Sequence, residues 1–129
     1  MSSKYCLDTH SLVWYFLGSS TLSRKAKSLI RAGFTHQATL VIPTLVLLET
    51  FHVSLKASHF SFPEFLVYLK AARILVAPFD KAVLKHCYKL PPKINIHDRI
   101  IAATALAYNC PLITKDKTLH QQAAVTVVW

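Results

Sequence analysis

Acidic side chains are scarce in this sequence. Its 129 residues contain six, against fifteen lysines and arginines, and they are Asp8, Glu49, Glu64, Asp80, Asp98 and Asp116. Carboxylates that gather in one place repel one another unless a cation lies between them. All-oxygen ligands select hard ions such as Mg²⁺ or Mn²⁺, which activate water and stabilise charge on a phosphoryl group. The chain can therefore carry out such metal-dependent chemistry only if its fold brings several of these acids together.

The elements that would position the acids follow from the hydrophobic pattern. Apolar, β-branched stretches predict strands over 4–7, 39–42, 74–77, 112–114 and 125–129. Longer amphipathic or apolar stretches predict helices over 10–17, 22–32, 44–57, 61–72, 80–90 and 96–108, with Thr44 as the cap of the third. This alternation predicts a parallel α/β sandwich, in a single domain over residues 1–129. Ligands of such folds bind where strands end and the following helices begin.

Two of the acids have ordinary structural roles. Ser61 and Glu64 have the spacing of a capping box at the start of a helix. Asp80 directly precedes a predicted helix, as an N-cap residue does.

The other four acids fall at one edge of the predicted sheet. Asp8 follows the first strand, and Asp116 lies two residues beyond Thr114, where the fourth strand ends. Asp98 lies in the first turn of helix 96–108, and Glu49 lies in the second turn of helix 44–57. Because these positions share the ligand-binding edge of a parallel α/β fold, we expect the four carboxylates to meet there.

Each of the four also has a structural alternative. Asp8 is a candidate helix cap, Asp98 a first-turn acid opposite an Asn95 cap, and Asp116 a turn residue. Glu49 is harder to explain in this way, because it shares a helix face with leucines. A carboxylate on an apolar face needs a partner or a metal ion.

Charge and composition narrow the class of partner. The formal net charge is +9, which favours a polyanion such as the phosphodiester backbone of a nucleic acid. Solubility, an acidic small molecule or an acidic protein partner would also account for it. With 53% hydrophobic and 16% charged residues, the chain is not disordered, and no apolar run reaches the ~18–20 residues of a membrane helix. The three cysteines lack metal-site spacing, so we expect free thiols and a soluble, cytoplasmic protein.

The segments that carry the four acids are the most distinctive parts of the sequence. They are YCLDTHSLVWYF around Asp8, VIPTLVLLET ending near Glu49, and HDRIIAATALAYNCPLITKD with Asp98 and Asp116, followed by a closing VTVVW. In order and spacing they resemble the PIN domain family, and within it the VapC-type toxins of toxin–antitoxin modules. The resemblance covers nearly the whole chain. One departure is Asn109, where relatives commonly have glycine; asparagine tolerates the left-handed conformation of a helix end.

The resemblance implies a three-layer α/β/α sandwich with a central parallel sheet of about four to five strands. It also implies a metal-dependent endoribonuclease that cuts RNA, forms a homodimer and is inhibited by an antitoxin protein. By the same resemblance, an acidic quartet would bind Mg²⁺ or Mn²⁺: Asp8, Glu49, Asp98 and Asp116. Thr114 stands where the family often has a hydroxyl beside the last acid, and Thr9 follows the first acid. Both are expected to support the site.

Other chemistries fit less well. Glu49 and His52 form a single E-x-x-H, whereas di-iron bundles need two copies. Neither a G-x-S-x-G elbow nor a glycine-rich phosphate loop is present. We interpret His97 as a residue of a helix first turn, and His10 as either a packing residue or a phosphate contact. Two alternatives remain. One is a non-catalytic nucleic-acid-binding or protein-interaction domain in which the acids are structural. The other is a metal phosphatase that acts on small substrates with similar ligands, which agrees less well with the basic charge.

Overall fold

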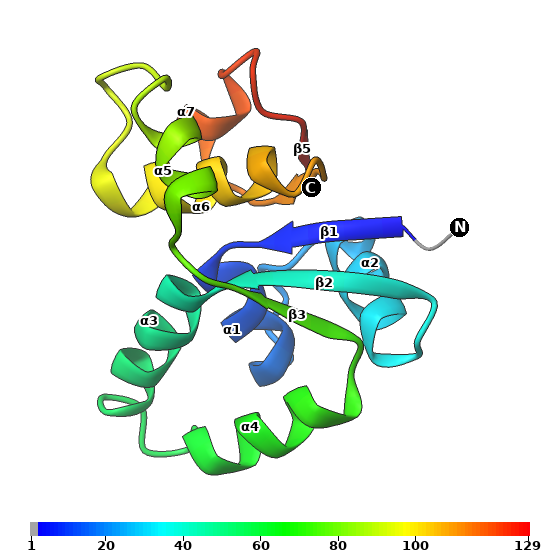
Figure 1. Cartoon of the computed structure of the whole chain (residues 1–129). Helices are drawn as coiled ribbons and strands as arrows, with labels where there is room; N and C mark the ends of the chain where they lie inside the picture. Colours follow the sequence, from blue (N-terminus) through cyan, green and yellow to red (C-terminus); the bar gives the residue numbers. More distant parts are fainter. Residues whose placement is uncertain (1–2) are drawn as a thin grey trace.

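A computed structural model describes residues 3–129 and is built on one parallel sheet (Figure 1). Its strands are β1 (Ser3–Leu7), β2 (Ala38–Pro43), β3 (Ile74–Ala77), β4 (Leu112–Ile113) and β5 (Val127–Val128). They lie in the order β3-β2-β1-β4-β5, and every neighbouring pair is parallel. The expected three-layer α/β/α sandwich with a parallel sheet is confirmed, and the sheet has five strands.

Helices cover both faces of this sheet. They are α1 (Thr9–Leu17), α2 (Arg24–Phe34), α3 (Thr44–Ser54), α4 (Phe62–Ala71), α5 (Lys81–Cys87), α6 (Ile96–Ala107) and α7 (Lys117–His120). In Figure 1, α5 and α6 lie on one side of β1 and β2, with α1, α3 and α4 on the other. The core between the layers is largely apolar around β1 and β2, where Leu7, Leu40 and Ile42 have no exposed surface. Among the described residues, no helix has both the length and the apolar character to cross a membrane.

The strand order places a crevice beside Asp8. From β1 the chain builds outward through β2 and β3, and then returns to add β4 and β5 on the other side of β1. Such a reversal leaves an opening between the carboxyl ends of the two strands at which it occurs, here β1 and β4. Asp8 follows β1 directly, and Thr114 follows β4 directly. Topology alone therefore brings Asp8 and Thr114, which are far apart in the sequence, to one site.

Most of the expected elements are observed, and the differences have local causes. Strand 74–77 is confirmed at both ends, and Ser61, Asp80 and Asn95 each cap a helix through their side chains. Thr44 was expected to cap α3, but it is the first helical residue, because the fixed φ of Pro43 supplies the extended residue before the helix. Helix α3 ends at Ser54 instead of residue 57.

Further differences lie toward the carboxyl end of the chain. Helix α5 ends at Cys87 instead of residue 90, strands β4 and β5 have two residues each, and α7 was not expected. Asn109 has the left-handed conformation that its position requires, with φ 51°. Cys6, Cys87 and Cys110 are free thiols, as expected.

Close packing between α2 and β2 leads to a first prediction. Gly33 of α2 faces Leu40 of β2 so closely that an added Cβ atom would overlap the leucine side chain, which is fully buried. We expect Gly33→Ala to lower the free energy of unfolding by about 1–3 kcal/mol, because overpacking forces side chains off their preferred rotamers. Urea unfolding measures the effect. The double variant with Leu40→Ala should show strong favourable coupling, and simple additivity of the two losses would contradict the overlap.

Candidate active site

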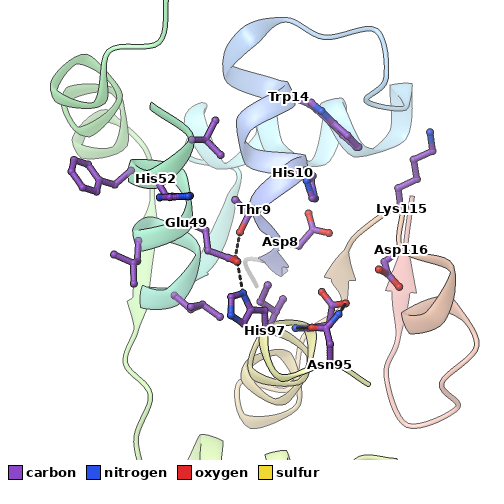
Figure 2. Close-up of a pocket in the computed structure, with 16 residues that line it drawn as sticks. Asp8, Thr9, His10, Trp14, Glu49, His52, Asn95, His97, Lys115 and Asp116 are labelled. Atoms are coloured by element: carbon purple, nitrogen blue, oxygen red, sulfur yellow. Dashed lines mark hydrogen bonds and ion pairs between the residues drawn. The ribbon is translucent and has the colours of Figure 1, made fainter. Parts of the chain in front are cut away.

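All four carboxylates of the expected quartet line one cavity, with a volume of about 970 Å³. Asp8 comes from the end of β1, Glu49 from α3, Asp98 from α6 and Asp116 from the segment after β4. Figure 2 shows Asp8, Glu49 and Asp116 around the same opening. Glu64 and Asp80, which were assigned to helix caps, do not line it. The sequence thus separated the two groups of acids correctly in space.

Thr114 links the first and last acids of this set. Its buried hydroxyl donates a hydrogen bond to Oδ2 of Asp8 and accepts one from the backbone N–H of Asp116 at 3.1 Å. The other oxygen of Asp8 accepts the N–H of Ser11 at 2.9 Å, which caps α1. Asp116 caps α7 in the same way, through the N–H of Leu119. Asp8 and Asp116 therefore each cap a helix and also belong to the acid cluster.

Glu49 is held by two side chains from other elements. Its Oε1 atom accepts a hydrogen bond from the hydroxyl of Thr9 at 2.6 Å, and its Oε2 atom lies 2.7 Å from Nδ1 of His97. Both contacts are drawn in Figure 2. His97 was interpreted as a residue of a helix first turn only, and that interpretation is incomplete, because its ring contacts an acid of the cavity. The helix face that carries Glu49, Leu45 and Leu48 faces this cavity, which explains a carboxylate among leucines.

Asp98 carries the clearest electrostatic sign of crowding. Burial raises the pKa of its carboxyl group above the ordinary value, and the nearby charge of Asp116 raises it further. The side-chain hydrogen bond from Asn95, at 2.7 Å, acts in the opposite direction, and Asp8 and Glu49 add smaller upward contributions. Asn95 also caps α6 by accepting the N–H of Asp98 at 2.9 Å. The four acids therefore interact electrostatically, although they lie far apart in the sequence.

Among the described residues, this cluster has no ion pair with lysine or arginine, and its basic partner is His97, beside Glu49. Between residues 3 and 129, no lysine or arginine forms an ion pair with Asp8, Asp98 or Asp116, although the chain has fifteen of them. The donor set is all oxygen, which suits a hard divalent cation. In the observed rotamers, these carboxylates accept hydrogen bonds from neighbouring groups. Among the described residues, no three Asp, Glu, His or Cys side chains are close enough together to hold a metal ion.

Several further residues line the cavity that sequence reasoning did not assign to it, among them Lys115, Trp14, Asn95 and His52. Lys115 precedes Asp116, and Trp14 and Asn95 come from α1 and from the cap of α6. The position of Lys115 beside an acid of the cluster was a usable signal. Three successive aromatic residues in one helix cannot all face the core, which was a signal for Trp14; its neighbours Tyr15 and Phe16 pack against aromatic side chains of other elements.

Arg99 fixes the loop that leads into the site. Its guanidinium group donates hydrogen bonds of 2.5–3.2 Å to four backbone carbonyls of the segment before α6. These carbonyls belong to Cys87, Leu90, Pro91 and Ile94. The loop carries Asn95, the partner of Asp98, so Arg99 positions the start of α6 without being part of the acid cluster.

A second prediction follows from these contacts. Arg99→Met keeps the apolar stem but leaves the carbonyls without their donors, so we expect it to lower the free energy of unfolding by about 2–3 kcal/mol. Arg99→Lys, with fewer donors in a less rigid arrangement, should recover part of this loss. Thermal or urea unfolding of the three proteins measures it. Equal stability of the methionine and lysine variants would contradict a role for the hydrogen bonds.

Comparison with known proteins agrees with this architecture. The family model of the PIN domain matches residues 5–125. The chain belongs to the PIN domain family. No curated protein sequence is significantly similar to it.

Several solved structures have the same fold. A chain of VapBC2 from Rickettsia felis, bound to a DNA fragment from its promoter, superposes with a TM-score of 0.72 at 17% identity, covering 97% of each chain. A chain of a toxin–antitoxin complex from Klebsiella pneumoniae gives 0.72 at 20% identity, covering 97% of this chain and 96% of the other. FitAcB from Neisseria gonorrhoeae gives 0.67 at 18%, with 97% and 96% covered. At these identities, the likeness establishes the fold of this PIN domain.

Proposed function

We propose that this protein is a metal-dependent endoribonuclease and the toxin of a type II toxin–antitoxin pair. PIN domains are generally nucleases. The observation that carries the proposal is the convergence of four carboxylates in one cavity where, within residues 3–129, no lysine or arginine is paired to Asp8, Asp98 or Asp116. Within a chain of net charge +9, an acidic cavity suits a cation that in turn meets a phosphodiester.

Asp8, Glu49, Asp98 and Asp116 would hold one or two Mg²⁺ or Mn²⁺ ions. A bound divalent ion supplies an activated water molecule and stabilises negative charge on the phosphoryl oxygens. Thr114 keeps the carboxylate of Asp8 in place and fixes the backbone of Asp116. Thr9 and His97 orient Glu49 from opposite sides of its carboxylate. The excess of basic residues outside the cavity would attract the RNA backbone.

The proposals for protein partners rest on the complexes in which similar chains were solved and on exposed apolar surfaces of this chain. The Klebsiella pneumoniae structure is a toxin–antitoxin complex, which supports an antitoxin partner for this chain. A second groove, lined by Phe16, Phe60 and Tyr68 with Lys27 and Arg31, is a candidate surface for that partner. We also propose a homodimer, since Leu48, Leu55 and other large apolar side chains are exposed. The protein would act in the cytoplasm, where its RNA substrate is found.

Cleavage of RNA by the purified protein tests the proposal. A mixed pool of cellular RNA would be incubated with protein freed of any co-purified partner, in Mg²⁺, in Mn²⁺ and in EDTA. The proposal predicts discrete products that require the metal ion and are lost in the Asp98→Ala variant. Binding of RNA without cleavage in any condition would favour the non-catalytic alternative. Cleavage that persists in EDTA would contradict a metal-dependent mechanism.

A further inference from the structure

One wall of the acidic cavity carries aromatic rings that the proposed chemistry does not use. His10 and Trp14 both line the cavity, with ring centroids 5.4 Å apart and an interplanar angle of 33°. Trp14 in turn meets the ring of Trp129 edge-on, with centroids 6.0 Å apart. Trp14 and Trp129 are half-buried, whereas His10 is exposed. The three rings therefore contact one another in the order Trp129, Trp14, His10, and the last of them is exposed in the cavity.

This series lies next to the acids and beside a basic side chain. His10 is two residues from Asp8, and Lys115 is the neighbour of Asp116. In Figure 2, His10 and Trp14 project on the side of the opening where Lys115 lies, away from Glu49 and His52. The wall on α3 differs in composition, because it presents Leu45, Leu48, Phe51 and His52. The side of the acid cluster near Lys115 thus combines two flat rings with a cation (Figure 2).

We propose that His10 and Trp14 form a stacking site for an unpaired base of the RNA, and that Lys115 contacts a phosphate beside it. This inference rests on the proposed function and adds to it a subsite that holds one unpaired base of the substrate. A base can stack on an aromatic face only after it has left its own helix. Trp14 is already held by Trp129, so little conformational freedom is lost when a base binds.

A stacking site accounts for features that packing alone does not. His10 is exposed at the acidic opening, so its ring is not part of the hydrophobic core. A site for phosphate alone would need cations, and it would gain nothing from an indole supported at its edge. Stacking on aromatic rings depends little on which base is present, so this site would select unpaired RNA without fixing its sequence.

Binding of short RNA probes tests the site. The protein would carry Asp98→Asn to block cleavage, and binding would be followed in Mg²⁺ by fluorescence anisotropy. The probes are a labelled single-stranded 12-mer of mixed sequence, the same strand in a duplex, and a base-free ribose-phosphate strand of equal length. We expect the single strand to bind at least about tenfold more tightly than the base-free strand, and more tightly than the duplex.

Substitutions at His10 separate stacking from charge. His10→Phe keeps a ring and should bind within about threefold of the parent, whereas His10→Ala and His10→Lys should each weaken binding about tenfold or more. The exposed position of His10 means that these variants should fold normally. Trp14→Leu should show the same loss, and Trp14→Phe should restore most of it. His59→Ala serves as the matched control, because His59 is an exposed histidine outside this cavity.

Tryptophan emission gives a direct signature of stacking. The chain has two tryptophans, so Trp129→Phe leaves Trp14 as the single reporter. Its emission should fall when the single strand binds and stay constant with the base-free strand. Equal affinity of the His10→Ala and parent proteins, or equal quenching by the base-free strand, would overturn the stacking site. Stacking in a protein that never cleaves RNA would overturn the proposed function instead and leave this site standing.

Discussion

Replacing Asp98 with asparagine is expected to remove metal-dependent cleavage and, at the same time, to raise the melting temperature of the metal-free protein. The two effects have one cause, the crowding of negative charge in the cavity. Burial and the charge of Asp116 raise the pKa of the Asp98 carboxyl group, and the hydrogen bond from Asn95 only partly offsets them. Asparagine removes the charge but keeps an oxygen and an amide for the contact with Asn95.

The direction of the stability effect follows from proton linkage. A raised pKa means that folded Asp98 keeps its proton to a higher pH than the unfolded chain does. As the pH rises from the ordinary value of 3.8 through the raised pKa, the unfolded state loses its proton first and is favoured. The ionised side chain therefore costs stability at neutral pH. Asparagine avoids this cost, and the advantage should fade toward pH 3.

Two measurements check the prediction. Thermal unfolding in EDTA at pH 7 and at pH 3 should show a higher melting temperature for Asp98→Asn at pH 7 only. Cleavage in Mg²⁺ should fall more than ~100-fold, beyond the ~10–100-fold typical of residues that only support a metal ligand. Lower thermal stability at pH 7, or cleavage within tenfold of the parent, would contradict the description of Asp98 as a crowded ligand.

Thr114→Val is expected to damage both the fold and the site. The hydroxyl of Thr114 is fully buried between the carboxylate of Asp8 and the backbone N–H of Asp116. Valine has nearly the same shape but provides neither a donor nor an acceptor. We expect the free energy of unfolding to fall by about 1–3 kcal/mol, because a buried carboxylate loses a donor. Cleavage should fall by ~10–100-fold, as for other residues that orient a ligand.

Thr114→Ser is the matched control for this change. Serine keeps the hydroxyl and removes a methyl group, so it should retain most of the activity while losing some packing stability. Urea unfolding and cleavage rates of the three proteins make the comparison. If serine and valine reduce activity equally, the hydroxyl does not orient Asp8 and the methyl group is what matters.

The sequence was most informative where a side chain must act locally. Strand and helix order followed from hydrophobic periodicity, and the caps by Ser61, Asp80 and Asn95 followed from spacing within one turn. The convergence of the four acids also followed, because parallel topology forces strand ends to one edge. For Asp8, the two readings as a helix cap and as a member of the cluster were both correct, since each of its oxygens has a different partner.

The contacts between distant residues were not predictable. The pairing of His97 with Glu49 joins residues 48 apart and depends on how α3 and α6 pack. The two-sided role of Thr114 depends on the register between β1 and β4. Thr44 was misassigned because a threonine before an apolar run looks like a cap, whereas Pro43 already begins the helix. Helix α7 has a single turn, too short to leave a periodic pattern in the sequence.

Binding of Mn²⁺ to six single variants tests the central claim most directly. Titration calorimetry would compare the parent protein with amide substitutions at each acid, Asp→Asn or Glu→Gln. We expect Mn²⁺ to bind the parent, and to bind four variants much more weakly: those at Asp8, Glu49, Asp98 and Asp116. The variants at Glu64 and Asp80, which line no part of the cavity, should bind like the parent. Equal binding by all six variants, or no binding by the parent, would contradict the assignment of these carboxylates as a metal site.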